Sequence, residues 1–271
     1  MADLRVTTLS GPDTVLKEAA VAAFKQSLRG QLITPGEDSY AEARQVWNGN
    51  IDRRPGLIAR PAGVADVIQA VNFARDHNLL VSVRGGAHSF AGTCVCNGGL
   101  VIDLSLMKAI RVDPVQHVVR AEGGVKWGEF DRETQFLREI SDDAIAIVIE
   151  HFASVPSPLS IPFFQQSGGA IRRGNTAYAH RDALYNLVLT AQWLDSGESE
   201  RHMRWTRELW QALQPYATGG VYVNHIGREE EDGADQVRAA YGANYQRLAE
   251  LKQKYDPTNL FRHNQNIKAA V

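Results

Sequence analysis

The sequence has little of what holds together small secreted or membrane-embedded folds. Only two cysteines occur in 271 residues, Cys94 and Cys96. They are too close together for an easy disulfide and too few for a structural zinc site, so we expect no metal centre. No apolar run approaches the roughly 18 residues of a membrane-spanning helix, and the first residues lack the basic-then-apolar pattern of a signal peptide. We therefore expect a soluble, cytoplasmic protein whose fold depends on packing.

The sequence also lacks an excess of either charge. Twenty-nine basic and 31 acidic residues give a formal net charge of -2. This balance provides no electrostatic basis for binding nucleic acid or an anionic membrane. A hydrophobic content of 44% excludes disorder and allows a sizeable core, while the oligomeric state is left open.

The spacing of hydrophobic residues predicts helices and strands in an irregular order. Helices are predicted at residues 13–29, 61–78, 126–140, 142–153 with Ser141 as N-cap, 198–213 and 233–254. Strands are predicted at residues 79–84, 99–105, 117–124, 158–168, 183–193 and 219–225. Because the two types do not alternate strictly, an α+β fold with a partly antiparallel sheet is favoured over a doubly wound parallel sheet.

A glycine-rich loop, RGGAHSFAG at residues 84–92, follows the predicted strand 79–84. Glycines tolerate positive φ and let successive backbone N–H groups converge on an anion, while Arg84 could add charge and His88 a reactive ring. The alternative is a tight turn with a surface histidine. The sequence has no GxxxxGK[ST] motif and no GxGxxG opening a helix after the first strand, which argues against a P-loop or a nicotinamide-binding Rossmann fold.

Longer segments around this loop carry a family resemblance. Residues 46–135, from VWNGNIDRRPG to WGEFDRETQ, resemble the PCMH-type FAD-binding half-domain of the vanillyl-alcohol-oxidase superfamily, and most of all its berberine-bridge-enzyme group. Residues 241–267, ending in YDPTNLFRHNQNI, resemble the terminal motif of that group, and residues 177–193 resemble part of its substrate domain. The resemblance implies three parts: the N-terminal part of an FAD-binding domain (1–135), a remnant of an antiparallel-sheet substrate domain with flanking helices (136–232), and a C-terminal berberine-bridge-type segment (233–271).

The resemblance also implies roles for individual residues. The cofactor is FAD, attached covalently through His88. Its other expected contacts are Arg84, Gly85, Gly86, Ala87, Ser89, Gly92, Asn264 and Asn266. A neutral imidazole nitrogen is a competent nucleophile for such a bond. Asn264 to Asn266 could instead be a polar segment that marks the end of a helix after Pro257.

The catalytic candidates lie in VYVNH. Tyr222 matches a position beside the flavin where a tyrosine often acts as a base, although its spacing alone is typical of a sheet aromatic. His225 is a second candidate base, and a histidine at a strand end can equally be only solvated.

The resemblance breaks after Gln135, where a long internal piece of the family is missing. That piece would carry the second half of the FAD pocket and a second, cysteine attachment point; Cys96 is interpreted instead as a small buried thiol. The main hypothesis is an FAD-dependent oxidoreductase acting on a hydroxyl or related C–H donor, with dioxygen as acceptor. The alternatives are a catalytically impaired flavin-binding or interaction remnant, and an incomplete gene model or artificial deletion.

Overall fold

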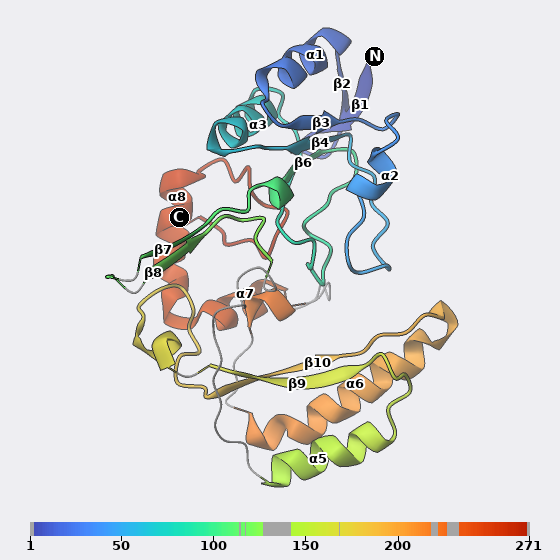
Figure 1. Cartoon of the computed structure of the whole chain (residues 1–271), viewed down its shortest axis with the longest axis vertical. Helices are drawn as coiled ribbons and strands as arrows, with labels where there is room; N and C mark the ends of the chain where they lie inside the picture. Colours follow the sequence, from blue (N-terminus) through green and yellow to red (C-terminus); the bar gives the residue numbers. More distant parts are fainter. Residues whose placement is uncertain are drawn as a thin grey trace. The chain divides into compact units, whose positions relative to one another are not determined.

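The computed structural model describes residues 3–113, 115–116, 118–126, 142–167, 169–217, 222–226 and 233–269 (Figure 1). The chain forms two compact units. Unit 1 comprises Met1–Thr134, Val223–Arg238 and Tyr245–Val271, and unit 2 comprises Gln135–Tyr222 and Ala239–Asn244. The two ends of the chain therefore belong to the same unit.

A four-stranded mixed sheet forms the centre of unit 1. Its strands lie in the order β3 (Gln31–Ile33), β4 (Leu57–Arg60), β6 (Leu100–Asp103) and β5 (Val81–Arg84). The last three are parallel, and β3 is antiparallel to β4. Two antiparallel pairs accompany this sheet: β1 (Leu4–Thr7) with β2 (Asp13–Leu16), and β7 (Ile110–Asp113) with β8 (Val118–Ala121). The helices of unit 1 include α1 (Glu18–Ser27), α2 (Tyr40–Ala43), α3 (Val64–Asp76) and α8 (Tyr245–Tyr255).

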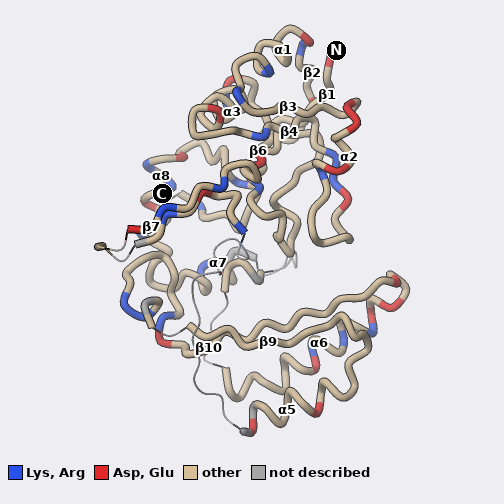
Figure 2. The backbone as a smooth tube through the Cα atoms, in the orientation of Figure 1, with Lys and Arg blue, Asp and Glu red and all other residues tan. Residues whose placement is uncertain are grey.

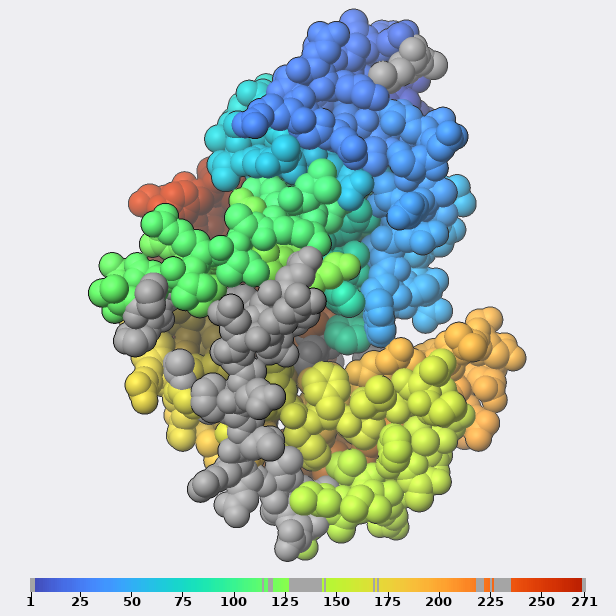
Figure 3. Space-filling view, in the orientation of Figure 1, coloured from blue at the N-terminus to red at the C-terminus, as the bar shows by residue number. Residues whose placement is uncertain are grey.

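Both faces of the central sheet are buried, as is usual for parallel strands. Leu57, Leu100 and Ile102 point into a core that α1 and α3 cover, whereas Ile58 and Val101 point to the opposite face. On that second face they pack with a smaller cluster that includes Ile33, Val95 and Cys96 and the partly buried Tyr40, Val46 and Ile51. In the space-filling view, the blue residues of the N-terminal part form a continuous surface (Figure 3).

The helix predicted at 61–78 is confirmed as α3, which ends near its predicted limit. Its buried side chains are small: Ala70 and Ala74 face the core, whereas Val64 and Ile68 are 65% and 53% exposed. The ring of Phe73 stacks on Phe24 of α1, with centroids 4.1 Å apart. The helix thus packs through its alanines, one aromatic pair and the partly buried Val71, whereas Val64 and Ile68 lie outside the core.

The prediction of one helix over residues 13–29 is wrong at its start. Residues 13–16 form β2, which pairs with β1 in antiparallel register, and the helix α1 begins only at Glu18. Leu4 lies opposite Leu16 in this pairing. A tertiary partner therefore overrides the local helical pattern, as often happens at element ends.

Unit 2 places two helices against a two-stranded sheet. Strands β9 (Ile161–Gln166) and β10 (Tyr185–Thr190) are antiparallel, and neither contains a charged residue (Figure 2). Helices α5 (Asp142–Ala153) and α6 (Ser199–Leu213) share a hydrophobic cluster with β10 that contains Trp205, Leu209, Leu187 and Leu189. The helices predicted at 142–153 and 198–213 and the strands predicted at 158–168 and 183–193 are confirmed.

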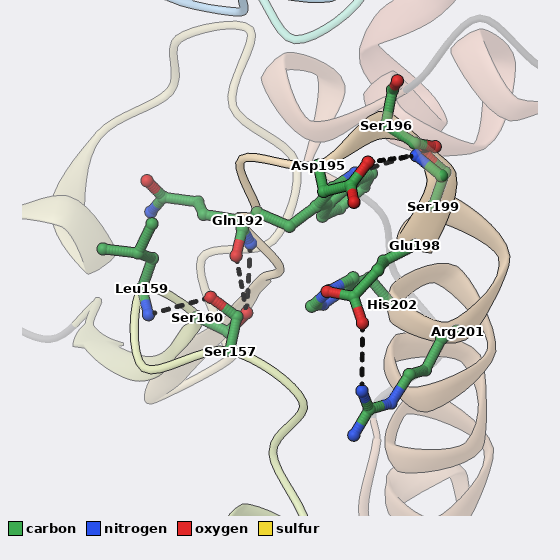
Figure 4. A network of polar contacts seen from close by, with 12 residues as sticks. Ser157, Leu159, Ser160, Gln192, Asp195, Ser196, Glu198, Ser199, Arg201 and His202 are labelled. Atoms are coloured by element: carbon green, nitrogen blue, oxygen red, sulfur yellow. Dashed lines mark hydrogen bonds and ion pairs between the residues drawn. The ribbon is translucent and has the colours of Figure 1, made fainter.

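A polar network connects the sheet of unit 2 to the start of α6 (Figure 4). Ser160 Oγ accepts a hydrogen bond of 3.0 Å from the backbone N–H of Gln192. His202 is fully buried, its ring stacks parallel to Trp193 with centroids 4.9 Å apart, and its Nε2 lies 3.7 Å from Glu198 Oε2. Neither ring nitrogen of His202 has a hydrogen-bond partner within the described residues.

Other predicted elements differ in detail. The segment predicted as one helix at 233–254 divides into α7 (Gly233–Tyr241), a short 3-10 turn and α8, with Gly242 at a φ of 50° between them. Residues 223–225, predicted as the end of a strand, form a 3-10 turn. The helix predicted at 126–140 and the Ser141 N-cap lie almost wholly outside the described residues. The overall α+β class is confirmed, and no described helix is both long enough and apolar enough to cross a bilayer.

Asp66, buried in the first turn of α3, joins the segment at Arg29 and Gly30 to the start of this helix. Its carboxylate accepts hydrogen bonds from the backbone N–H groups of Arg29, Gly30 and Ala62, at 3.0, 2.9 and 2.8 Å. Burial raises the pKa of Asp66, but these three bonds lower it more, so its pKa lies below the ordinary value. Its stabilising effect is therefore present above the ordinary carboxyl pKa of about 3.9 and is lost as the pH falls through the lower folded-state value.

We expect Asp66→Asn to lower the free energy of unfolding by about 2 kcal/mol at neutral pH, because a charged acceptor of three N–H groups is replaced by an amide with one acceptor oxygen. Urea unfolding at neutral and acidic pH measures the effect. The difference between wild type and variant should shrink as the pH falls from about 4 through the lower folded-state pKa of Asp66, because the wild-type carboxylate then becomes protonated too. A variant as stable as wild type at neutral pH would contradict this assignment.

Candidate functional site

The glycine loop predicted from the sequence begins at the carboxyl end of β5, the edge of a parallel sheet where ligands commonly bind. Arg84 is the last residue of the strand, and the loop continues to Gly92. Ala87 and Gly92 adopt left-handed conformations with φ of 63° and 67°. Within the described residues, no acceptor receives a hydrogen bond from the N–H groups of Gly86, Ala87 or His88. Three consecutive free N–H groups around a left-handed residue are typical of an anion-binding backbone concavity.

Glycine is required at the base of this loop because another backbone comes very close. A Cβ on Gly85 would overlap the carbonyl oxygen of Gly123, and a Cβ on Gly124 would overlap the carbonyl oxygen of Leu104. The turn at Gly123 and Gly124 therefore lies directly against the base of the loop. Lys126, at the end of this turn, is near Gly86.

A preceding segment holds the loop along its length. The backbone N–H of Trp47 donates to Ala87 O at 3.0 Å, and the side-chain amide of Asn48 donates to Phe90 O at 3.0 Å. Arg53 Nη1 donates to Gly92 O at 2.8 Å and to Val95 O at 2.7 Å. The contacts engage the carbonyl side of the loop, which leaves the N–H groups at 86–88 available.

His88 is exposed, and its nearest aromatic neighbour is Trp47. The two ring centroids are 5.8 Å apart with planes inclined by 37°, and Trp47 is itself 51% exposed. An exposed imidazole beside a flat indole is accessible to a planar ring system. The geometry is compatible with the tether predicted for His88.

Arg84, predicted to contact the cofactor, is buried, and its guanidinium is directed to protein groups. Nη2 donates to Asp103 Oδ2 at 2.5 Å, and Nη1 donates to Gln45 O at 3.2 Å. Ser89 is also engaged locally, since its Oγ accepts the N–H of Thr93 at 3.1 Å.

The C-terminal segment reaches the end of the same loop. Asp256, after α8, accepts the N–H groups of Leu260 and Phe261 at 2.7 and 3.1 Å, which turns the chain back toward the sheet. His263 Nε2 then lies 2.7 Å from Arg53 Nη1 and 3.2 Å from Val95 O. The structure thus brings residues 260–266 to the loop across about 170 residues of chain.

The predicted Asn-Gln-Asn residues have distinct surroundings. The side-chain amides of Asn264 and Gln265 donate to Phe261 O at 3.2 Å and to Ile226 O at 2.9 Å. The Oδ1 atom of Asn266 is buried and has no hydrogen-bond partner in the described part of the chain. A buried acceptor without a donor is costly, so Asn266 is a candidate for binding a ligand N–H or O–H group.

The two predicted catalytic residues are in different situations. Tyr222 lies in unit 2, half-buried, and its ring meets that of Tyr178 edge-on with centroids 5.8 Å apart. Burial, and to a lesser degree the neighbouring Tyr222, raises the pKa of Tyr241. The side chain of His225 lies outside the described residues.

Both cysteines are buried and free, and burial raises the pKa of each thiol. Cys96 has no exposed surface and belongs to the core cluster under the sheet. Within the described residues, no group of three His, Cys, Asp or Glu side chains could hold a metal ion.

Comparison with known proteins shows which families segments of this chain resemble. Residues 55–138 match the model of the FAD binding domain family, and residues 221–268 match that of the berberine and berberine-like family. Neither match reaches half of the chain, which in these two segments is similar to the berberine-bridge-enzyme-like FAD-linked oxidoreductases.

Relatives match this chain over limited segments. (R)-6-hydroxynicotine oxidase of Paenarthrobacter nicotinovorans is 36% identical over 107 residues, which are 40% of this chain and 23% of that protein. An FAD-linked oxidoreductase of Dictyostelium discoideum is 36% identical over 115 residues, 42% of this chain and 25% of the relative. The matches thus span about a quarter of the length of these relatives.

Solved structures share the fold. 6-Hydroxy-D-nicotine oxidase from Arthrobacter nicotinovorans superposes with a TM-score of 0.66 at 19% identity, over 89% of this chain and 98% of that one. The berberine-bridge-enzyme-like protein 1 of Physcomitrella patens superposes with a TM-score of 0.69 at 14% identity, over 91% and 98% of the two chains.

The residues present fit FAD on structural grounds. Unpaired loop N–H groups suit the diphosphate, exposed His88 suits a tether, and the unpartnered Asn266 Oδ1 suits a polar edge of a ring system. Sequence reasoning did not identify Trp47, Arg53 or His263. All three lie in segments that carry the family resemblance, but nothing local indicates which of Arg53 and Arg54 turns inward.

We expect Gly85→Ala to lower the free energy of unfolding by about 1–3 kcal/mol, because its Cβ would displace the backbone at Gly123. Gly36→Ala is the matched control, since a Cβ there meets nothing within 4 Å, and we expect it to change stability by less than about 0.5 kcal/mol. Thermal unfolding of both variants checks the prediction. Equal midpoints for the two would mean that the base of the loop is not closely packed.

Proposed function

We propose that this chain is an FAD-dependent oxidoreductase that oxidises a hydroxyl-bearing or related carbon of a small-molecule donor, with dioxygen as electron acceptor. The observation that carries the proposal is the loop after β5, where three N–H groups without a described acceptor adjoin an exposed histidine in a segment matching the FAD binding domain. The two relatives compared above are themselves named as an oxidase and an FAD-linked oxidoreductase.

The residues of unit 1 would bind and retain the cofactor. The N–H groups of residues 86–88 would hold the diphosphate, and Asn264 and Asn266 would approach the ring system. His88 would form a bond from an imidazole nitrogen to the 8α carbon of the flavin. Formation of this bond would release two protons and two electrons, which dioxygen would accept to give hydrogen peroxide. When bound, FAD supplies the acceptor for a hydride leaving the donor carbon.

Tyr222 would take the proton of the donor hydroxyl through its phenolic oxygen as the hydride leaves. The ring of Tyr178, which meets that of Tyr222 edge-on with centroids 5.8 Å apart, would help to orient the phenol. His225 remains the second candidate for this role.

A flavin-binding module without turnover is the second candidate function. It is supported by the extent of the match, since the 107 matched residues make up 23% of the nicotine oxidase relative. In unit 2, β9 and β10 form a sheet of only two described strands. A donor site with fewer walls would admit water and lose catalytic effect while the loop could still hold FAD.

The first test is the near-ultraviolet and visible absorption of the purified protein, repeated on the pellet and supernatant after acid precipitation. We expect flavin absorption that stays with the pellet in wild type and is lost from the pellet in His88→Ala. His77→Ala, which removes a histidine beside Phe73 on α3, is the control and should retain pellet-bound flavin. A colourless protein that takes up no added FAD would refute the proposal.

Tyr222→Phe tests turnover separately from binding. With any alcohol, sugar or amine donor that bleaches the wild-type flavin, we expect the rate to fall by about 10²–10⁴-fold, the usual effect of losing a general base, at unchanged flavin content. Tyr178→Phe is the control, because it removes a neighbouring hydroxyl and keeps the ring. Bound flavin that no donor reduces in wild type would favour the module without turnover.

A further inference from the structure

Three charged side chains end the three parallel strands of unit 1 in adjacent positions. Arg60 is the last residue of β4, Asp103 of β6 and Arg84 of β5, and β6 lies between the other two strands. The strand register places Arg84 directly opposite Asp103. These three residues, here named the strand-end cluster, lie where the glycine loop begins.

The carboxylate of the cluster is committed mainly to Arg84. Asp103 is fully buried, and its Oδ2 lies 2.5 Å from Arg84 Nη2 and 3.3 Å from Arg60 Nε. The first contact is a hydrogen bond, whereas Arg60 Nε is close without hydrogen-bond geometry and has no other partner among the described residues. Arg60 instead donates through Nη2 to Ser105 Oγ at 3.2 Å. Arg60 thus adds charge rather than a second bond to Asp103.

The cluster carries one positive charge in excess. Two guanidinium groups face one carboxylate, and no other acidic side chain in the described part of the chain pairs with Arg60 or Arg84. A charge in this partly dry position is screened less by salt than a surface charge. The excess lies at the carboxyl end of the parallel strands, where an anionic ligand of the loop would bind.

The cluster is also connected to two segments that support the loop: the segment before Trp47 and the turn at Leu104. Arg84 Nη1 donates to Gln45 O, two residues before Trp47, whose N–H holds Ala87 O. On the other side, Asp103 Oδ1 accepts the N–H of Ser105 at 3.1 Å and so fixes the short turn at Leu104, against which Gly124 packs. One carboxylate therefore joins the loop, the segment that holds it and the turn that supports its base.

Resting on the function proposed above, we propose that the strand-end cluster is the positioning device of the glycine loop. Arg84 acts on a bound diphosphate through the loop that it anchors and not by contact, because its guanidinium is 7% exposed and bonded to Asp103 and Gln45. The excess charge, carried by Arg60, attracts the anion at a distance. Arg84 is accordingly a positioning residue rather than the cofactor contact predicted from the motif.

The test uses the full chain with His88→Ala as the parent, so that FAD binding is reversible. Arg84→Lys keeps the charge but loses the fixed fork of donors, and we expect about tenfold weaker FAD binding by calorimetry. We also expect about tenfold faster hydrogen exchange of the Trp47 and Gly92 amides, which donate to Ala87 O and Ser89 O of the loop. Arg60→Gln removes the excess charge and keeps the loop contacts. We expect about threefold weaker binding at low salt and a smaller difference at high salt, with unchanged exchange.

Val21→Ala is the matched control for general destabilisation, because Val21 is fully buried in the core under α1. It should lower the unfolding temperature without changing FAD affinity or exchange in the loop. The proposal would be overturned if Arg84→Lys kept the FAD affinity and the amide exchange of the parent. It would also be overturned if Val21→Ala lost as much FAD affinity as Arg84→Lys. The Arg60 side chain is 29% exposed, so its replacement should be tolerated. If Arg84→Lys does not fold, the proposal is overturned instead by an Arg60→Gln variant that binds FAD at low salt as tightly as the parent. A wild-type chain that takes up no FAD would refute the proposed function, and amide exchange would still decide whether the cluster orders the loop.

Discussion

The ends of the parallel strands in unit 1 depend on the fully buried carboxylate of Asp103. An ionised carboxylate without exposed surface is costly unless charged and hydrogen-bonding partners surround it. Here two arginines from the neighbouring strands and the N–H of Ser105 fulfil that need. These contacts of the carboxylate fix the ends of three strands relative to one another. The glycine loop starts at one of these ends, so its first residues are fixed as well.

The second constraint is the close approach of backbones at glycine. Gly85 and Gly124 have no room for a Cβ, so the turn after β8 supports the base of the loop without an intervening side chain. The carbonyl side of the loop is held by Trp47, Asn48 and Arg53, which leaves its N–H side available. Anion binding by backbone thus depends on which face of the peptide groups the rest of the unit occupies.

Unit 2 is organised by different forces. Its sheet carries no charge along its strands, and its stability comes from the cluster that α5 and α6 form with β10. Charged side chains lie outside the strands, for example at the start of α6, where Glu198 lies beside Arg201 and the buried His202. Because the strands carry no charge and the helices have a regular hydrophobic spacing, both helices and both strands could be predicted from hydrophobic spacing alone.

Local sequence determined much of this protein: α3 and β5, the glycine loop between β5 and the Cys94 region, and the terminal motif, because spacing, turn chemistry and motif order act over a few residues. Tertiary structure decided the rest. Residues 13–16 become a strand because β1 offers a partner, and Arg84 turns inward because Asp103, 19 residues away, needs a counter-charge. His263 reaches Val95 from the far end of the chain. Each outcome depends on a partner distant in sequence, and local patterns carry no information about such partners.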